Sequence, residues 1–127
     1  MEESVGKNIL IVDDEIDLTT LLKKGLESDG FYVGSYNDPL LALHEFRAGF
    51  YDLMLIDIRM PKMNGFEFYH KLRNKDINIR VCFMTAFSLS YEEVRKMLPV
   101  ESITRQNLIQ KPIGIKELIK RINEILR

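Results

Sequence analysis

The chain has little of what would support disulfides, a membrane span or a strongly charged surface. Its single cysteine, Cys82, excludes an intrachain disulfide framework, and the apolar neighbours of Cys82 indicate a buried thiol. No apolar run approaches the roughly 20 residues that a membrane-spanning helix needs, and the acidic start is unlike a signal peptide. The formal net charge of -1 gives no sign of binding to nucleic acid or to an anionic membrane. We therefore expect a cytoplasmic protein.

The sequence does contain a regular alternation of short apolar runs and segments with helical spacing, which is typical of an α/β protein. The apolar runs predict strands at 7–12, 31–36, 52–56, 78–85 and 108–110. The helical segments are expected at 16–29, from 39 to a stop at Gly49, from 65 to 72, at 90–98 and over 115–126. Asp38 and Asn64 stand where the second and third helices need N-caps.

This order of elements predicts a flavodoxin-like (βα)5 fold, in which a doubly wound parallel five-stranded sheet of order 2-1-3-4-5 carries helices on both faces. The 127 residues show no internal repeat and no second core pattern. We therefore expect a single domain over residues 1–127, with its structured core over residues 7–127.

Polar side chains stand at the carboxyl ends of four predicted strands. Asp13 and Asp14 follow the first strand, Asp57 follows the third, Thr85 ends the fourth and Lys111 follows the fifth. Because these ends meet at one edge of a parallel sheet, we expect the five side chains to converge. Three clustered carboxylates repel one another, and oxygen ligands suit Mg2+. Helix capping and first-turn charge are the competing explanation, and they account well for Asp14 or Glu15 but poorly for Lys111.

These segments resemble the response-regulator receiver family along nearly the whole chain. The resemblance rests on residues 11–15 (IVDDE), 55–65 (LIDIRMPKMNG), 85–86 (TA) and 111–112 (KP). It implies that Asp57 accepts a phosphoryl group in a reaction that needs Mg2+ or Mn2+. The implied donor is a phosphohistidine on a sensor histidine kinase or a phosphotransfer protein, and the domain would hydrolyse its own phosphate slowly.

The same resemblance assigns roles to the other residues of the cluster. Asp14 and Asp57 would be direct metal ligands, Asp13 would hold a metal-bound water, and the backbone carbonyl of Arg59 would complete the protein ligands. A carboxylate that is ionised at neutral pH needs no general base to attack phosphorus.

The resemblance also implies a switch. Thr85 would be the hydroxyl that moves onto the acyl phosphate, with Lys111 as its ion-pair partner and a cis peptide between Lys111 and Pro112. A downstream output protein or domain would then read the fourth helix, the fifth strand and the last helix.

Two features depart from the family pattern. Leu108 stands where the family often has an aromatic residue. The stretch 87–110 is a few residues longer than usual and contains the segment 99–107 in place of a turn of small residues. We therefore expect a monomer or a weak dimer. Arg59 and Phe87 would flank the approach of water to the phosphate, which predicts a long-lived phosphorylated state.

Two other functions remain open from the sequence. A degenerate receiver would act as a phosphorylation-independent interaction module, although the complete set of acids, Thr85 and Lys111 argues against it. A metal-dependent phosphatase with an aspartyl nucleophile tends to have a second acid two residues after the nucleophile, where this chain has Arg59. A flavin site is disfavoured because no loop rich in glycine, serine and threonine follows the first predicted strand.

Overall fold

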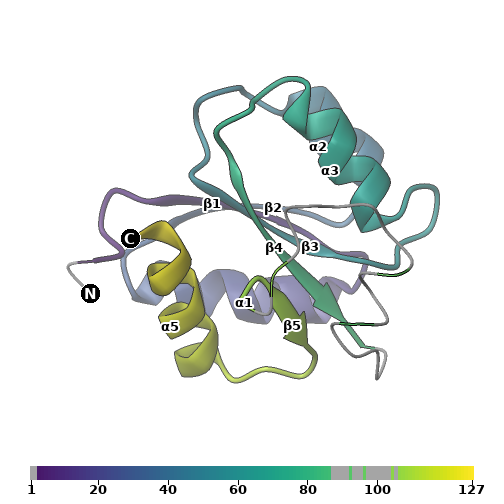
Figure 1. Cartoon of the computed structure of the whole chain (residues 1–127). Coiled ribbons are helices and arrows are strands. Elements are labelled where there is room, and N and C mark those ends of the chain that lie inside the picture. The colour runs from purple at the N-terminus through teal and green to yellow at the C-terminus, as the bar shows by residue number, and fades with distance from the viewer. Residues whose placement is uncertain (1–2, 87–91, 93–95, 97–103, 105) are drawn as a thin grey trace.

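Five parallel strands form one sheet in the order β2-β1-β3-β4-β5, which confirms the predicted fold class (Figure 1). The computed structural model describes residues 3–86, 92, 96, 104 and 106–127, so the helix expected at 90–98 lies almost wholly outside the described residues. The strands are β1 (Asn8–Val12), β2 (Tyr32–Tyr36), β3 (Leu53–Asp57), β4 (Arg80–Thr85) and β5 (Leu108–Gln110). The helices are α1 (Ile16–Ser28), α2 (Pro39–Glu45), α3 (Gly65–Arg73) and α5 (Ile115–Leu126).

The helices cover the sheet in two layers. Helices α1 and α5 lie on one face, and α2 and α3 lie on the other (Figure 1). Alternate residues of β1 pack into the two resulting cores, with Ile9 and Ile11 on the α1/α5 side and Leu10 and Val12 on the α2/α3 side. This two-sided burial explains why the strand is continuously apolar. No helix among the described residues has both the length and the apolar character to cross a bilayer.

Two helices begin at the side-chain caps that the sequence predicts. The Asp38 carboxylate accepts a hydrogen bond from the backbone N–H of Leu40, and Pro39 occupies the first turn of α2. The Asn64 side chain accepts hydrogen bonds from the N–H groups of Phe66 and Glu67 at the start of α3. These caps satisfy amides that have no partner within the helix, and they set where the loops after β2 and β3 end.

The second helix is shorter than predicted, because it ends at Glu45 rather than at Gly49. Phe46 already has an extended backbone, with φ of -61° and ψ of 134°. Its ring stacks on the ring of Tyr51 at a centroid distance of 6.1 Å. Gly49, at a φ of 79°, shapes the turn before β3 instead. Aromatic packing therefore ends α2 one turn earlier than the glycine indicated.

The two ends of the described chain lie side by side (Figure 1). The carboxylate of Glu3 lies 2.6 Å from the guanidinium of Arg127. The hydroxyl of Ser4, which is fully buried, donates to Asp29 at 2.6 Å and accepts from Asn123 at 3.4 Å. The segment before β1 is therefore packed between the end of α1 and helix α5.

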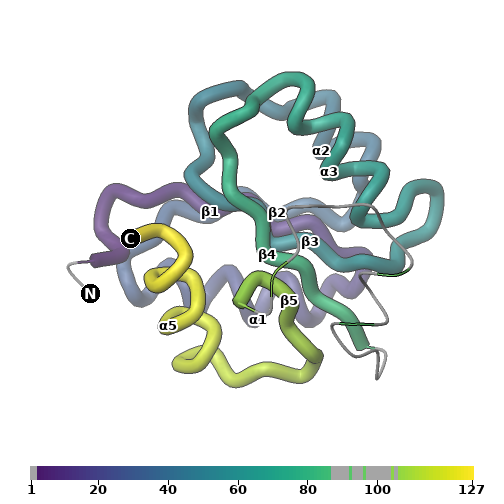
Figure 2. The backbone as a smooth tube through the Cα atoms, in the orientation of Figure 1, coloured from purple at the N-terminus to yellow at the C-terminus, as the bar shows by residue number. Residues whose placement is uncertain are grey.

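The backbone trace shows how the fold gathers the polar loops. After β1, β2 and β3 the chain crosses over and returns to the starting edge of the sheet (Figure 2). Because all neighbouring strands are parallel, the loops after β1, β3, β4 and β5 leave from one edge. This edge carries the predicted functional residues.

Candidate functional site

Three carboxylates meet at the carboxyl edge of the sheet, as the sequence predicts. Oxygen atoms of Asp13, Asp14 and Asp57 lie within 4.8 Å of one another, with Asp13 and Asp57 buried and Asp14 exposed. Strands β1 and β3 pair Val12 with Ile56, so the next residue of each strand is an acid of this cluster. Oxygen atoms this close repel one another when ionised. The donor set therefore fits a hard divalent cation such as Mg2+.

The ammonium of Lys111 lies among these acids. Its Nζ is 2.7 Å from Asp13 Oδ2, 3.1 Å from Glu15 Oε1 and 3.5 Å from Asp57 Oδ2. The position follows from the sheet, because the backbone N–H of Lys111 donates to the Thr85 carbonyl at 2.8 Å and so continues the pairing of β4 with β5. The cis peptide between Lys111 and the following proline is present, as the resemblance implied.

Thr85 and Arg59 are placed at the same edge by the ends of β4 and β3. Thr85 is buried at the end of β4, directly after Met84, which pairs with Asp57. The N–H of Arg59 donates to the Asp57 carboxylate, while the Arg59 residue itself is exposed. Phe87, the other residue expected beside the phosphate, lies outside the described residues.

The environment makes Asp57 harder to ionise than a carboxyl in water. Burial, and after it the charge of Asp13, raise the pKa of Asp57 to about 6 against the opposing effects of Lys111 and the Arg59 N–H. Burial alone would lower the pKa of Lys111, but its hydrogen bonds to Asp13 and Glu15 outweigh burial, and its pKa is raised. At pH 7 Lys111 therefore carries an ammonium and Asp57 is mostly ionised. The pKa of Asp57 lies closer to neutral pH than the sequence led us to expect.

Glu15 also belongs to this site, although from the sequence we expected it only at a helix start. Its carboxylate reaches Lys111, and its backbone N–H donates to Asp13 Oδ1 at 2.9 Å. The signal in the sequence was a third acid after β1, which we interpreted as part of a helix start. Only the fold shows that its side chain points to a lysine 96 positions later.

Two further residues support the backbone of the site. The Asn37 amide donates to the Asp13 carbonyl at 2.8 Å and to the Thr19 hydroxyl at 2.9 Å, which ties the loop after β2 to the loop after β1. Gly65 packs against the backbone of Asp57, where a Cβ atom would come within 2.4 Å of the carbonyl oxygen. The sequence indicated a helix start at Gly65, but it did not indicate this contact.

An apolar hollow of about 420 Å³ lies beside the site, between α1 and the start of α5. Leu18, Leu21, Ile113 and Ile115 are among its lining residues. Leu21 is 67% exposed. Gly25 lets the two helices approach closely, because a Cβ atom there would collide with the Ile115 side chain at 2.4 Å. We call this surface the α1/α5 hollow; it adjoins the loop that carries the Lys111 ammonium.

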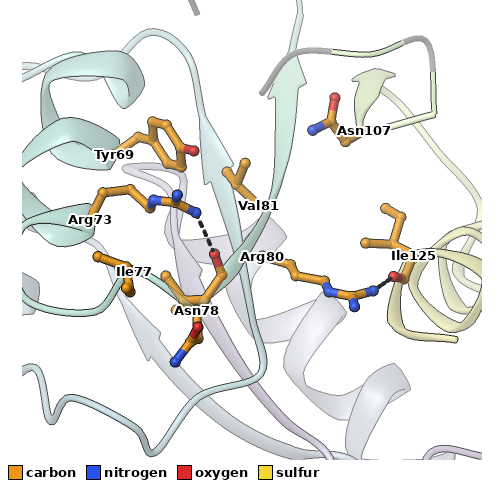
Figure 3. A pocket seen from close by; sticks show the side chains of 9 residues that line it. Tyr69, Arg73, Ile77, Asn78, Arg80, Val81, Asn107 and Ile125 are labelled. Atoms are coloured by element: carbon orange, nitrogen blue, oxygen red, sulfur yellow. Dashed lines mark hydrogen bonds between the residues drawn. The ribbon is translucent and has the colours of Figure 1, made fainter. Parts of the chain in front are cut away.

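A second hollow, of about 440 Å³, lies between α3 and the end of α5 (Figure 3). Its two guanidinium groups hold backbone carbonyls, since Arg73 donates to Ile79 at 3.4 Å and Arg80 donates to Ile125. Arg80 begins β4, so this hollow lies at the opposite end of that strand from the acidic cluster. None of the predicted site residues lines it.

Comparison with known proteins finds transcriptional regulatory proteins among the relatives of this chain. The chain is 40% identical over 119 residues to the transcriptional regulatory protein CpxR homolog of Haemophilus influenzae, covering 94% of this chain and 50% of the relative. It is 32% identical over 123 residues to the alkaline phosphatase synthesis transcriptional regulatory protein PhoP of Bacillus subtilis, covering 97% of this chain and 50% of the relative. The chain thus spans about half the length of the curated relatives it matches.

Solved structures agree in fold. The Thermotoga maritima response regulator TrrA, in complex with Mg(2+)-BeF, superposes with a TM-score of 0.78 at 30% identity, covering 94% of this chain and 99% of TrrA. The non-phosphorylated HemR receiver domain of Leptospira biflexa gives a TM-score of 0.80 at 28% identity, with 94% of each chain covered. The family model of the response regulator receiver domain matches residues 9–123. This match over most of the chain shows that the protein belongs to the response regulator receiver domain family.

Proposed function

We propose that this receiver domain takes a phosphoryl group onto Asp57 from a phosphohistidine on a sensor histidine kinase or phosphotransfer protein. The observation that carries the proposal is the position of the Asp57 carboxylate, which lies 3.5 Å from the Lys111 ammonium and inside one cluster with Asp13 and Asp14. A carboxylate oxygen of Asp57 attacks phosphorus, the phosphorus–nitrogen bond breaks, and the imidazole leaves with the bonding electrons.

The acidic cluster is the proposed site for Mg2+ or Mn2+. Asp14, Asp57 and the backbone carbonyl of Arg59 would bind the ion directly, and Asp13 would hold it through a metal-bound water. When bound, the ion supplies positive charge that offsets the charge of the transferring phosphoryl oxygens. The donor set supports this assignment, because it consists of clustered carboxylate oxygens with no histidine or cysteine among the described residues that form it.

The remaining polar groups act on the phosphoryl group from the protein side. Lys111 provides a second positive charge at the edge of the cluster and pairs with the phosphoryl oxygens. Thr85, buried at the end of β4, turns its hydroxyl toward the acyl phosphate and so links phosphorylation to the position of the β4 end. Phosphorylation then shifts an existing equilibrium between an inactive and an active form.

The donor protein docks on the α1/α5 hollow. Its phosphohistidine must reach Asp57 at the carboxyl edge, and this apolar surface adjoins that edge through the loop between Lys111 and α5. Leu21, which lines the hollow, is 67% exposed, so its side chain is open to a partner. An amphipathic helix of the donor would bury this side chain in the manner of other helix-in-groove contacts.

The output lies outside this domain. The curated relatives are transcriptional regulators of about twice the length of the aligned segment, so a separate output domain or protein, not the receiver, would contact DNA. We propose a cytoplasmic protein whose receiver is a monomer or forms a weak dimer, because Leu108 replaces an aromatic residue on the surface that would signal.

Acetyl phosphate with Mg2+, followed by intact mass measurement, tests the function. The wild-type protein should gain one phosphoryl group, and Asp57→Asn should gain none. Equal labelling of Asp57→Asn would overturn the assignment of the acceptor. A wild-type protein that takes up no phosphate from acetyl phosphate or from any phosphohistidine donor would instead support a phosphorylation-independent interaction module.

A further inference from the structure

We propose that Glu15 is a positioning residue, which holds the Lys111 ammonium back from Asp57 until a phosphoryl group arrives. The proposal deepens the proposed function and rests on it for its consequence, although the contact itself does not. It assigns a role to the third acid after β1, beyond the metal-binding role proposed for the two acids before it.

The distances carry the first step. Lys111 Nζ lies closer to Glu15, at 3.1 Å, than to Asp57, at 3.5 Å, while Asp13 holds it at 2.7 Å. The lysine side chain is only 8% exposed, whereas that of Glu15 is 58% exposed. One ammonium is therefore shared by three carboxylates, and Glu15 draws it toward the rim of the site.

The local geometry of Glu15 carries the second step. Glu15 is the N-cap residue of α1, but its side chain makes no capping hydrogen bond to the helix. It reaches Lys111 instead, while its backbone N–H donates to Asp13 Oδ1. The backbone of Glu15 thus binds Asp13 and its side chain binds Lys111, which stabilises the ion pair between those two residues. The side chain does not cap α1.

The consequence concerns the transfer of the phosphoryl group. Lys111 must exchange the Glu15 carboxylate for a phosphoryl oxygen on Asp57 before it can offset the charge of the transition state. The free energy needed to break the contact between Lys111 and Glu15 adds to the barrier for phosphoryl transfer. An uncharged side chain at position 15 removes this contribution to the barrier, and Lys111 then moves closer to Asp57.

Three variants distinguish the effect of the contact between Glu15 and Lys111 from the effect of removing a negative charge near the site. Glu15→Gln keeps the length of the side chain and removes its charge. Glu15→Asp keeps the charge but is too short by one methylene to keep the contact. Asp17→Asn removes an exposed acid of the first turn of α1 that has no ion pair among the described residues.

Initial rates of labelling by acetyl phosphate with Mg2+ should rise on the order of fivefold in Glu15→Gln, as expected for loss of one partly exposed ion pair. Glu15→Asp should rise similarly, and Asp17→Asn should stay near the wild-type rate at high salt. A Glu15→Asp rate equal to that of the wild type, or an Asp17→Asn rate equal to that of Glu15→Gln, would show that charge alone acts and would overturn the proposal.

A second measurement needs neither Mg2+ nor phosphorylation. The side-chain ammonium signal of Lys111, followed by nitrogen-15 NMR in the metal-free protein, should show faster hydrogen exchange with water in Glu15→Gln and Glu15→Asp than in the wild type. Unchanged exchange in both variants would show that Glu15 does not hold the ammonium. If exchange changes but the wild type cannot be labelled at all, the proposed phosphoryl transfer fails while the contact stands.

Discussion

The α-carbon of Gly65 lies directly against the backbone carbonyl of Asp57. A Cβ atom at position 65 would come 2.4 Å from the Asp57 oxygen and 3.1 Å from its carbonyl carbon. Both neighbours are backbone atoms at the end of a central strand, so they cannot move aside as a flexible side chain would. The start of α3 therefore fixes the position of the proposed phosphoryl acceptor.

Gly65→Ala should destabilise the fold by about 1 to 3 kcal/mol, because overpacking displaces either α3 or the end of β3. Labelling by acetyl phosphate should slow as well, since Asp57 lies at the displaced point. Gly114→Ala is the matched control, because a Cβ atom there meets nothing within 4 Å. Urea denaturation and initial labelling rates measure the two effects, and a Gly65→Ala protein as stable as Gly114→Ala would contradict the contact.

Asp57→Asn should stabilise the metal-free protein at neutral pH. The folded state raises the pKa of Asp57 from 3.8 to about 6, so it binds the proton more tightly than the unfolded chain does. This contribution to stability is complete below about pH 4 and is lost as the pH rises through about 6. At pH 7 the free energy of unfolding of the wild type should therefore be lower than that of Asp57→Asn by up to roughly 3 kcal/mol.

Urea denaturation of both proteins in EDTA, at a series of pH values from 4 to 8, checks this difference. The gap between the two proteins should widen up to about pH 7 and then level off. A gap that is constant over this range would mean that Asp57 ionises in the folded state as it does in water.

Mg2+ should raise the melting temperature of the wild type, because a ligand that binds only the folded state stabilises it. Asp14→Ala should remove this response, since Asp14 is the exposed acid of the cluster. Asp17→Ala, which removes an exposed acid three residues after Asp14, should keep the response. Thermal denaturation at several Mg2+ concentrations makes the measurement, and a full response in Asp14→Ala would place the ion elsewhere.

Leu21→Glu should slow phosphoryl transfer from a phosphohistidine donor protein at least about tenfold, because it places a charge in the apolar α1/α5 hollow. Labelling by acetyl phosphate should not change, since the small donor needs no docking surface. Leu40→Glu, at an exposed position on α2, is the control for an added surface charge. Equal slowing by the two substitutions would show that the hollow is not the docking surface.

The sequence determined the order of the elements and the edge of the sheet that carries the chemistry. Periodicity indicates burial, and burial on two faces predicts parallel strands between helices. Because the carboxyl ends of such strands meet, the residues that follow them could be assigned to one site before any contact was known. Asp13, Asp57 and Lys111 were found together for this reason.

Tertiary structure alone decided what each of these groups touches. Lys111 meets Glu15 across 96 positions of sequence, and no local pattern encodes such a contact, because it depends on how α1 and the end of β5 pack. The pKa of Asp57 likewise follows from burial and from the distance to Asp13. The early end of α2 follows from the packing of Phe46 on Tyr51. Local periodicity selects helices and strands, whereas contacts between distant segments set the charges and distances that the chemistry uses.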